Sequence, residues 1–101
     1  RYFECLPGGY STLEYHEHTH MVMIGRGKGQ LLLGDKIYDV KKGDFIEIPG
    51  NTIHQFRANK GDYIGFFCLV NKERDKVKLL SDEEMETLRN HPKIKAFLES
   101  C

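Results

Sequence analysis

Short apolar runs separated by glycine-containing turns recur throughout residues 1–70. The runs are RYFECL, HMVMIG, GQLLLG, KIYDV, FIEI, IHQFRA and YIGFFCLV. Runs of this length and spacing predict about eight antiparallel strands, folded as a sandwich or small barrel. Gly34-Asp35 is typical of a tight hairpin, and Gly25, Gly27 and Gly29 are expected to separate strands. The runs LLL and GFFCLV do not alternate, so we expect strands buried on both faces.

The composition changes after Val70. The segment NKERDK is a charged connector, expected to be solvated, and the remaining residues predict two short helices. Ser81 and Glu84 form an S-x-x-E capping box at the first helix start, and Pro92 suits the first turn of the second. The sequence therefore predicts a β domain over 1–70 and a connector with a helical extension over 71–101. The extension is expected to pack on the sheet or on a partner subunit.

Composition narrows the function classes. Fifteen Lys and Arg balance fifteen Asp and Glu, so the chain has no strong field for holding nucleic acid. No apolar run is long enough to span a bilayer. Three widely spaced cysteines, at 5, 68 and 101, predict neither a disulfide framework nor a thiolate metal site, and they favour a reducing, cytoplasmic location.

The stretch LEYHEHTHMV places Glu14, His16, His18 and His20 at every second position. Alternate residues of a strand share one face, and imidazole and carboxylate are good ligands for first-row divalent metals. An exposed polar strand that carries histidines by chance is the alternative for this stretch alone.

Two spaced patterns extend this cluster. The first consists of Gly8, Glu14, His16, His20 and Gly27, and the second of Gly43, Pro49 and His54. Together they resemble the paired motifs of the cupin superfamily over about residues 2–70. In the usual motifs a histidine stands at the Glu14 position and a glutamate at the His20 position, so the set of three imidazoles and one carboxylate is kept. Asn51 and Ala58 replace a glycine and an asparagine.

The resemblance implies an all-β fold, an antiparallel jelly-roll barrel, or double-stranded β-helix, of the cupin type. It also implies a divalent metal (Mn, Fe, Ni, Co or Zn) held by Glu14, His16, His20 and His54. The function that it favours is that of a metal-dependent enzyme, of oxygenase, decarboxylase or isomerase type, acting on a small oxygenated molecule. The oligomeric state that it favours is a homodimer. The alternatives are a non-catalytic sensor of a sugar or metabolite, and a structural zinc site that only stiffens the barrel.

Other polar residues are weaker candidates. Glu47, Tyr15 and Arg57 are possible catalytic residues, and Tyr10 a possible substrate contact; for Glu47 the surface interpretation is favoured. His18 is expected in the turn between the two ligand-bearing strands. Remaining features are interpreted as structural: Val22 and Ile24 as an apolar wall, Phe56 as a pocket residue, Phe66 and Phe67 as core, and Cys68 as a buried, unreactive thiol. Met21 and Met23 are expected on the opposite sheet surface.

Overall fold

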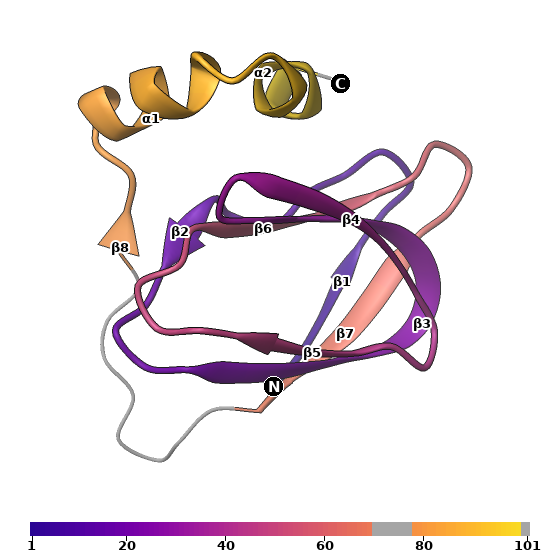
Figure 1. Cartoon of the computed structure of the whole chain (residues 1–101). Helices are drawn as coiled ribbons and strands as arrows, with labels where there is room; N and C mark the ends of the chain where they lie inside the picture. The colour runs from indigo at the N-terminus through magenta and orange to yellow at the C-terminus, as the bar shows by residue number, and fades with distance from the viewer. Residues whose placement is uncertain (70–77, 100–101) are drawn as a thin grey trace.

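The computed structural model describes residues 1–69 and 78–99 and contains two curled sheets and two helices (Figure 1). The strands are β1 (Tyr2–Cys5), β2 (Glu14–Tyr15), β3 (His20–Leu33), β4 (Lys36–Lys41), β5 (Phe45–Ile48), β6 (His54–Ala58), β7 (Ile64–Leu69) and β8 (Lys78–Leu79). The helices are α1 (Asp82–Arg89) and α2 (Pro92–Glu99). The prediction of an all-β antiparallel barrel with a short helical extension is confirmed.

The long strand β3 belongs to both sheets. Its first half pairs with β5 and β7, and β7 pairs in turn with β1. Its second half pairs with β4 and β6, and β6 continues through β2 to β8. Every one of these pairings is antiparallel. One strand thus joins the two layers and leaves an interior between them (Figure 1).

The glycines at 25, 27 and 29 do not end a strand, contrary to the sequence prediction. They lie inside β3, where a bulge between Ile24 and Arg26 shifts the register against β7. Gly27 has a φ of +74°, and a Cβ there would collide with the carbonyl oxygen of Tyr63. Bulges with glycine in the left-handed region bend a strand and increase its twist. These glycines therefore carry β3 from one sheet to the other.

The core has two parts, one on each side of the sheet that contains β4, β6 and β2. The interior cluster includes Val22, Ile24, Leu31, Phe56 and Phe66. Consecutive strand residues point to opposite faces, so Leu31 enters this interior whereas Leu32 packs outside, beneath the helices. The prediction that the LLL run is buried on both faces is confirmed. The inward placement of Val22 and Ile24 is also as predicted.

The two helices cover the outer face of the sheet that contains β4, β6 and β2 (Figure 1). Leu88, Ile94 and Phe97 pack there with Leu32 and Ile37. The capping box predicted at Ser81 and Glu84 is present, and Pro92 begins α2 as expected. The tail thus packs on its own barrel. The predicted charged connector lies mainly outside the described residues, and the strand β8 at its end was not predicted.

The first sheet keeps an exposed outer face. Register pairs Tyr2 with Phe67, Phe67 with Met23, and Met23 with Phe45, which makes one row across β1, β7, β3 and β5. All four side chains are exposed, and Phe67 keeps 40% of its surface accessible. The sequence interpretation of Phe67 as core is therefore wrong, as is the burial of the whole GFFCLV run on both faces, because no helix covers this sheet in the described part of the chain.

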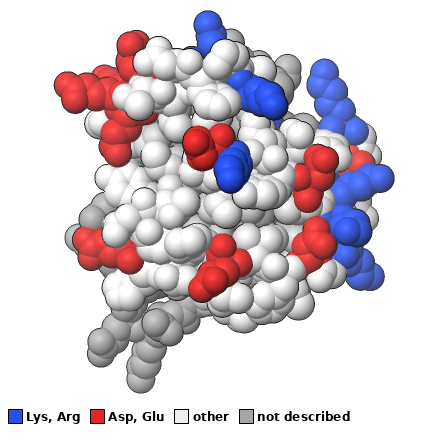
Figure 2. All heavy atoms as spheres, in the orientation of Figure 1, with Lys and Arg blue, Asp and Glu red and all other residues white. Residues whose placement is uncertain are grey.

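Charges of both signs share the surface seen in Figure 2, with basic side chains gathered along one edge. Over the described ranges, neither helix has the length and apolar character needed to cross a membrane.

Replacing Gly27 by alanine should destabilise the fold by more than about 2 kcal/mol, since the change combines a left-handed backbone with a backbone clash. The matched control is Gly61→Ala, where φ is +83° and nothing lies within 4 Å of the new Cβ. That variant should cost about 1–2 kcal/mol, the backbone contribution alone. Urea unfolding of both variants measures the difference, and equal costs would contradict the role assigned to Gly27.

Candidate metal centre

Strand pairing between β2 and β6 brings the two sequence motifs together. Glu14 and His54 are direct partners in the register of these strands. Residues opposite each other in an antiparallel pair have Cβ atoms only about 5 Å apart on the same face. The backbone therefore places a carboxylate from the first motif beside an imidazole from the second.

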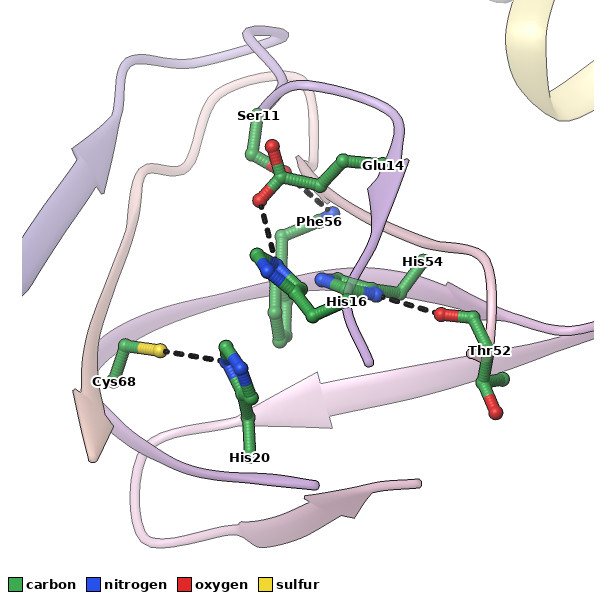
Figure 3. A network of polar contacts seen from close by, with 8 residues as sticks. All are labelled: Ser11, Glu14, His16, His20, Thr52, His54, Phe56 and Cys68. Carbon is green, nitrogen blue, oxygen red and sulfur yellow. Dashed lines mark hydrogen bonds and ion pairs between the residues drawn. The ribbon is translucent and has the colours of Figure 1, made fainter. Parts of the chain in front are cut away.

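Three donor groups converge from these strands and from the residue after β2. Ligand atoms of Glu14, His16 and His54 all lie within 4.8 Å of one another. The Nε2 atom of His16 is 3.2 Å from Oε1 of Glu14 (Figure 3). The centroid of the His16 ring is 5.2 Å from the centroid of the His54 ring. Two imidazoles and a carboxylate suit a first-row divalent ion. The donor set fits the metal implied by the sequence motifs.

His54 is held in one orientation. Its Nδ1 lies 2.9 Å from the carbonyl oxygen of Thr52, and a carbonyl can only accept, so Nδ1 carries the proton and Nε2 keeps its lone pair. Such a bond to the second ring nitrogen is the usual way to orient a metal-binding histidine. Burial lowers the pKa of His54 from 6.5 to about 4, with smaller contributions from His16 and His20 opposed by the Thr52 bond. The imidazole is therefore neutral, as a metal ligand must be.

His20, the fourth predicted ligand, lies at the edge of this group. It begins β3, is 4% exposed, and its ring is 4.1 Å from the ring of His16. Its Nδ1 is 3.7 Å from the sulfur of Cys68 (Figure 3). The three donors within 4.8 Å do not include His20, so the structure brings three of the four predicted residues together and places the fourth beside them.

The segment that carries Glu14 and His16 is fixed to its neighbours by hydrogen bonds. Ser11 receives the backbone N–H of Phe56 on its Oγ and donates its own N–H to the Phe56 carbonyl. The backbone N–H of Asn51 donates to the carbonyl of His16. Asn51 has a φ of +57°, and asparagine is among the few side chains that tolerate this region. The replacement of the motif glycine at this position is therefore accommodated.

A cavity of about 670 Å³ adjoins the donor group. Glu14, His16, His20 and His54 all line it, and Val22, Ile48, Phe56 and Phe66 supply apolar walls. The volume falls in the range of small-molecule sites, which combine apolar walls with a few polar groups. Phe56 lines the pocket, as predicted. A structural metal site needs no such cavity, so the arrangement favours a site that admits a ligand.

Among the weaker candidates, only Tyr10 lines the cavity. Glu47 is exposed, in agreement with the surface interpretation. Tyr15 alternates with Glu14 and His16 along the chain and is not among the cavity residues. Arg57 is buried on the opposite face of β6 from His54, where its guanidinium lies over the rings of Tyr10 and Phe97. His18 is an exposed residue in the bend between β2 and β3, as expected.

The sequence interpretation of Cys68 as a buried thiol is wrong, whereas its interpretation as unreactive stays a prediction. Its side chain is only partly buried, lines the cavity and contacts His20. Cys68 pairs with Val22, which makes it the diagonal neighbour of His20 across β3 and β7. The even positions 64, 66 and 68 could have indicated a shared inward face. The sequence could not give the register against β3 that selects His20 as the neighbour.

Comparison with known proteins agrees with this fold and this site over most of the chain. The Cupin domain family matches residues 1–70, and the chain belongs to this family. Two solved structures are similar throughout. A cupin 2 conserved barrel domain protein from Rhodopseudomonas palustris is 52% identical with a TM-score of 0.92, over 95% of this chain and 66% of that one. A cupin-2 domain protein from Rhodospirillum rubrum is 44% identical with a TM-score of 0.93, over 98% of this chain and 67% of that one.

One relative carries the name of an activity. The chain is 46% identical over 99 residues to the 1-methylthio-D-xylulose 5-phosphate methylsulfurylase of Rhodospirillum rubrum. The match covers 98% of this chain and 64% of that protein, so the chain spans somewhat less than two thirds of its length.

The lowered pKa of His54 predicts how the metal-free protein responds to acid. Between pH 6.5 and about 4 the unfolded chain binds a proton at this residue and the folded chain does not, so the free energy of unfolding decreases as the pH falls. The contribution is full above the unfolded pKa, and about 3 kcal/mol is lost across this window. Urea unfolding at several pH values measures the slope. His54→Gln should flatten it, whereas the same change at exposed His91 should not; equal slopes in all three proteins would contradict the assignment.

Proposed function

We propose that this chain is the metal-binding domain of an enzyme that removes the methylthio group from a methylthio-substituted ketose phosphate. The observation that carries the proposal is the convergence of Glu14, His16 and His54 on the wall of a 670 Å³ cavity. The identity of 46% to a methylsulfurylase acting on 1-methylthio-D-xylulose 5-phosphate supports the substrate class. This substrate is a small oxygenated molecule. The proposal replaces oxygenase, decarboxylase or isomerase chemistry by cleavage of a carbon–sulfur bond.

Different residues of the site would have different roles, some holding the metal and others shaping the cavity. Glu14, His16 and His54 would hold a divalent ion of Mn, Fe, Co, Ni or Zn, with His20 as a neighbouring fourth donor. Such an ion, when bound, supplies a Lewis acid for a substrate oxygen such as the ketone of a ketose. Val22, Ile48, Phe56 and Phe66 keep the reacting end of the cavity apolar, which strengthens electrostatic interactions there.

The rim of the same cavity offers polar groups for the rest of such a substrate. Ser11, Thr12 and Tyr10 bring hydroxyl groups to the lining, and Arg1 brings a positive charge suited to a phosphate. Ser11 is held in place by its bonds to β6. A ketose phosphate would thus lie with its phosphate toward the rim and its methylthio end toward the apolar wall.

The purified protein is incubated with 1-methylthio-D-xylulose 5-phosphate and a small thiol. In proton NMR, the S-methyl signal of the substrate should disappear and a new S-methyl signal should appear at a different chemical shift. His16→Ala removes a proposed ligand, so metal content by elemental analysis should fall at least about tenfold, and substrate consumption should fall with it. His18→Ala, in the exposed bend, is the matched control and should retain both. Binding of the substrate without consumption would favour the sensor alternative, and equal metal in wild type and His16→Ala would refute the ligand assignment.

We further propose that a second copy of the chain covers the exposed row of Tyr2, Phe67, Met23 and Phe45, which gives the homodimer expected from the sequence. The row is continuous across four strands, and contiguous exposed apolar surface commonly marks an interface. A two-fold dimer would place the same face on both subunits.

A charge at the centre of this row should dissociate the dimer. Met23→Glu is expected to weaken self-association at least about tenfold, because it would bury two unpaired carboxylates in one interface. Analytical ultracentrifugation measures the effect. Tyr38→Glu, on exposed β4 of the other sheet, is the control and should remain dimeric. A wild-type protein that sediments as a monomer would refute the interface.

A further inference from the structure

Arg57 is a buried cation on the outer face of β6, away from the metal donors. Successive strand residues alternate in direction, so His54 and Phe56 line the cavity, whereas Arg57 lies against α2 and is only 5% exposed. Burying a charge is costly unless hydrogen bonds compensate it, and apolar side chains in place of buried charges are often no less stable. The guanidinium is therefore expected to make a contact that an apolar side chain could not.

The guanidinium of Arg57 joins the last turn of α2 to the rim of the cavity. Its Nη2 donates to the carbonyl oxygen of Leu98 at 3.4 Å, and the last carbonyls of a helix have no acceptor role within the helix itself. This end of the helix dipole is negative, so it partly compensates the buried charge. The central carbon of the guanidinium lies 4.7 Å from the ring centroid of Tyr10 and 5.0 Å from that of Phe97. Tyr10 is thus linked through Arg57 to α2.

Tyr10 belongs to a segment that follows β6 and supplies polar groups to the rim of the cavity. It forms an isolated bridge with Arg57, and Ser11 exchanges two hydrogen bonds with Phe56. Gln55, which is also buried, donates from Nε2 to the carbonyl oxygen of Ser11 at 2.8 Å. These bonds fix the backbone of the segment. The side chain of Tyr10 is nevertheless 55% exposed, so its orientation depends on contacts such as the one with Arg57.

We infer that Arg57 is a positioning residue, which holds the ring of Tyr10 at the cavity rim and so raises the affinity for the sugar phosphate. The inference rests on the proposed function for the identity of this ligand. An exposed aromatic side chain samples several rotamers, and a ligand that uses it must otherwise order it. Stacking against the planar guanidinium limits these rotamers before the ligand arrives. The helix α2 thereby contributes to substrate binding, although none of its described residues lines the cavity.

The effect of Arg57 should fall on binding rather than on the chemical step. Its side chain lies on the opposite face of β6 from His54, outside the group of converging donors. Loss of an interaction that stabilises substrate and transition state equally raises KM and leaves kcat unchanged. Ordering one side chain on binding weakens affinity by about 3- to 10-fold. A residue that only stabilised the fold would instead lower metal content and kcat when it is replaced.

The experiment measures kcat and KM of the whole metal-loaded chain with 1-methylthio-D-xylulose 5-phosphate and dithiothreitol. Arg57→Met should raise KM by about 3- to 10-fold, with kcat within about twofold and metal content unchanged. In a Tyr10→Ala background the same change should raise KM no further, because the effect passes through that ring. Arg57→Lys keeps the charge without the planar face and should resemble Arg57→Met. Arg26→Met is the matched control and should behave as wild type, since that guanidinium lies 4.1 Å from the ring of Tyr63 and neither residue lines the cavity.

A second probe, D-xylulose 5-phosphate, lacks the methylthio group, and its dissociation constant from calorimetry separates this inference from the proposed function. If substrate is consumed but Arg57→Met keeps the wild-type KM, adds its effect to that of Tyr10→Ala, or loses metal and kcat, the positioning role is overturned and the proposed function stands. If the methylthio substrate stays unchanged but Arg57→Met binds D-xylulose 5-phosphate about 3- to 10-fold more weakly, the proposed function fails and the positioning role stands. If wild type binds neither sugar phosphate, both fail. Arg57→Lys keeps the test decisive if Arg57→Met folds poorly.

Discussion

The pairing of Glu14 with His54 is the contact on which the candidate site depends. It joins two distant segments through the ladder between β2 and β6, and it sets the side chains of the two motifs on one inner face. The pairing is possible only because β3 runs through both sheets and turns the intervening chain back on itself. A change in register of one residue would send His54 outward and place Gln55 in the cavity.

The neutral imidazole of His54, in an apolar enclosure, helps to explain why the cluster is compatible with folding. Burying charged groups without partners is costly, and His54 avoids this cost because its pKa is lowered to about 4. The one N–H that the ring retains, at Nδ1, donates a hydrogen bond to the Thr52 carbonyl oxygen. The same neutral, oriented state is the one that a metal ion requires. Stability of the metal-free fold and readiness to bind metal thus follow from the same desolvation.

Much of the fold could be predicted from the sequence because its signals are local. Glycine-bounded runs gave the strands β4 and β5, the Ser81 capping box gave the start of α1, and Pro92 gave the start of α2. The errors have non-local causes. The glycines around Gly27 suggested a break, but pairing with β7 on one side and β6 on the other keeps β3 continuous. Whether Phe67 is core depends on whether another layer covers its sheet, and alternation cannot show that.

The donor positions of the site were likewise accessible from spacing, since strand alternation gives Glu14 and His16 one face. The residues that lie beside these donors in the site could not be predicted from spacing. His20 begins a new strand after a bend, so its distance from the other donors depends on how that bend is built. Cys68 becomes part of the site only through its register with Val22, a relation between segments that no local pattern encodes.

The exchange of carboxylate and imidazole between the Glu14 and His20 positions has a consequence for chemistry at the cavity wall. Divalent ions depend on the set of donors more than on their order in the chain, so the exchange keeps the proposed metal-binding character. It changes what stands beside Cys68, however: a glutamate at position 20 would set a carboxylate against the sulfur and would disfavour negative charge there. The imidazole of His20, 3.7 Å away, imposes no such repulsion. The departure from the usual motif therefore leaves an imidazole, rather than a carboxylate, beside the sulfur of Cys68.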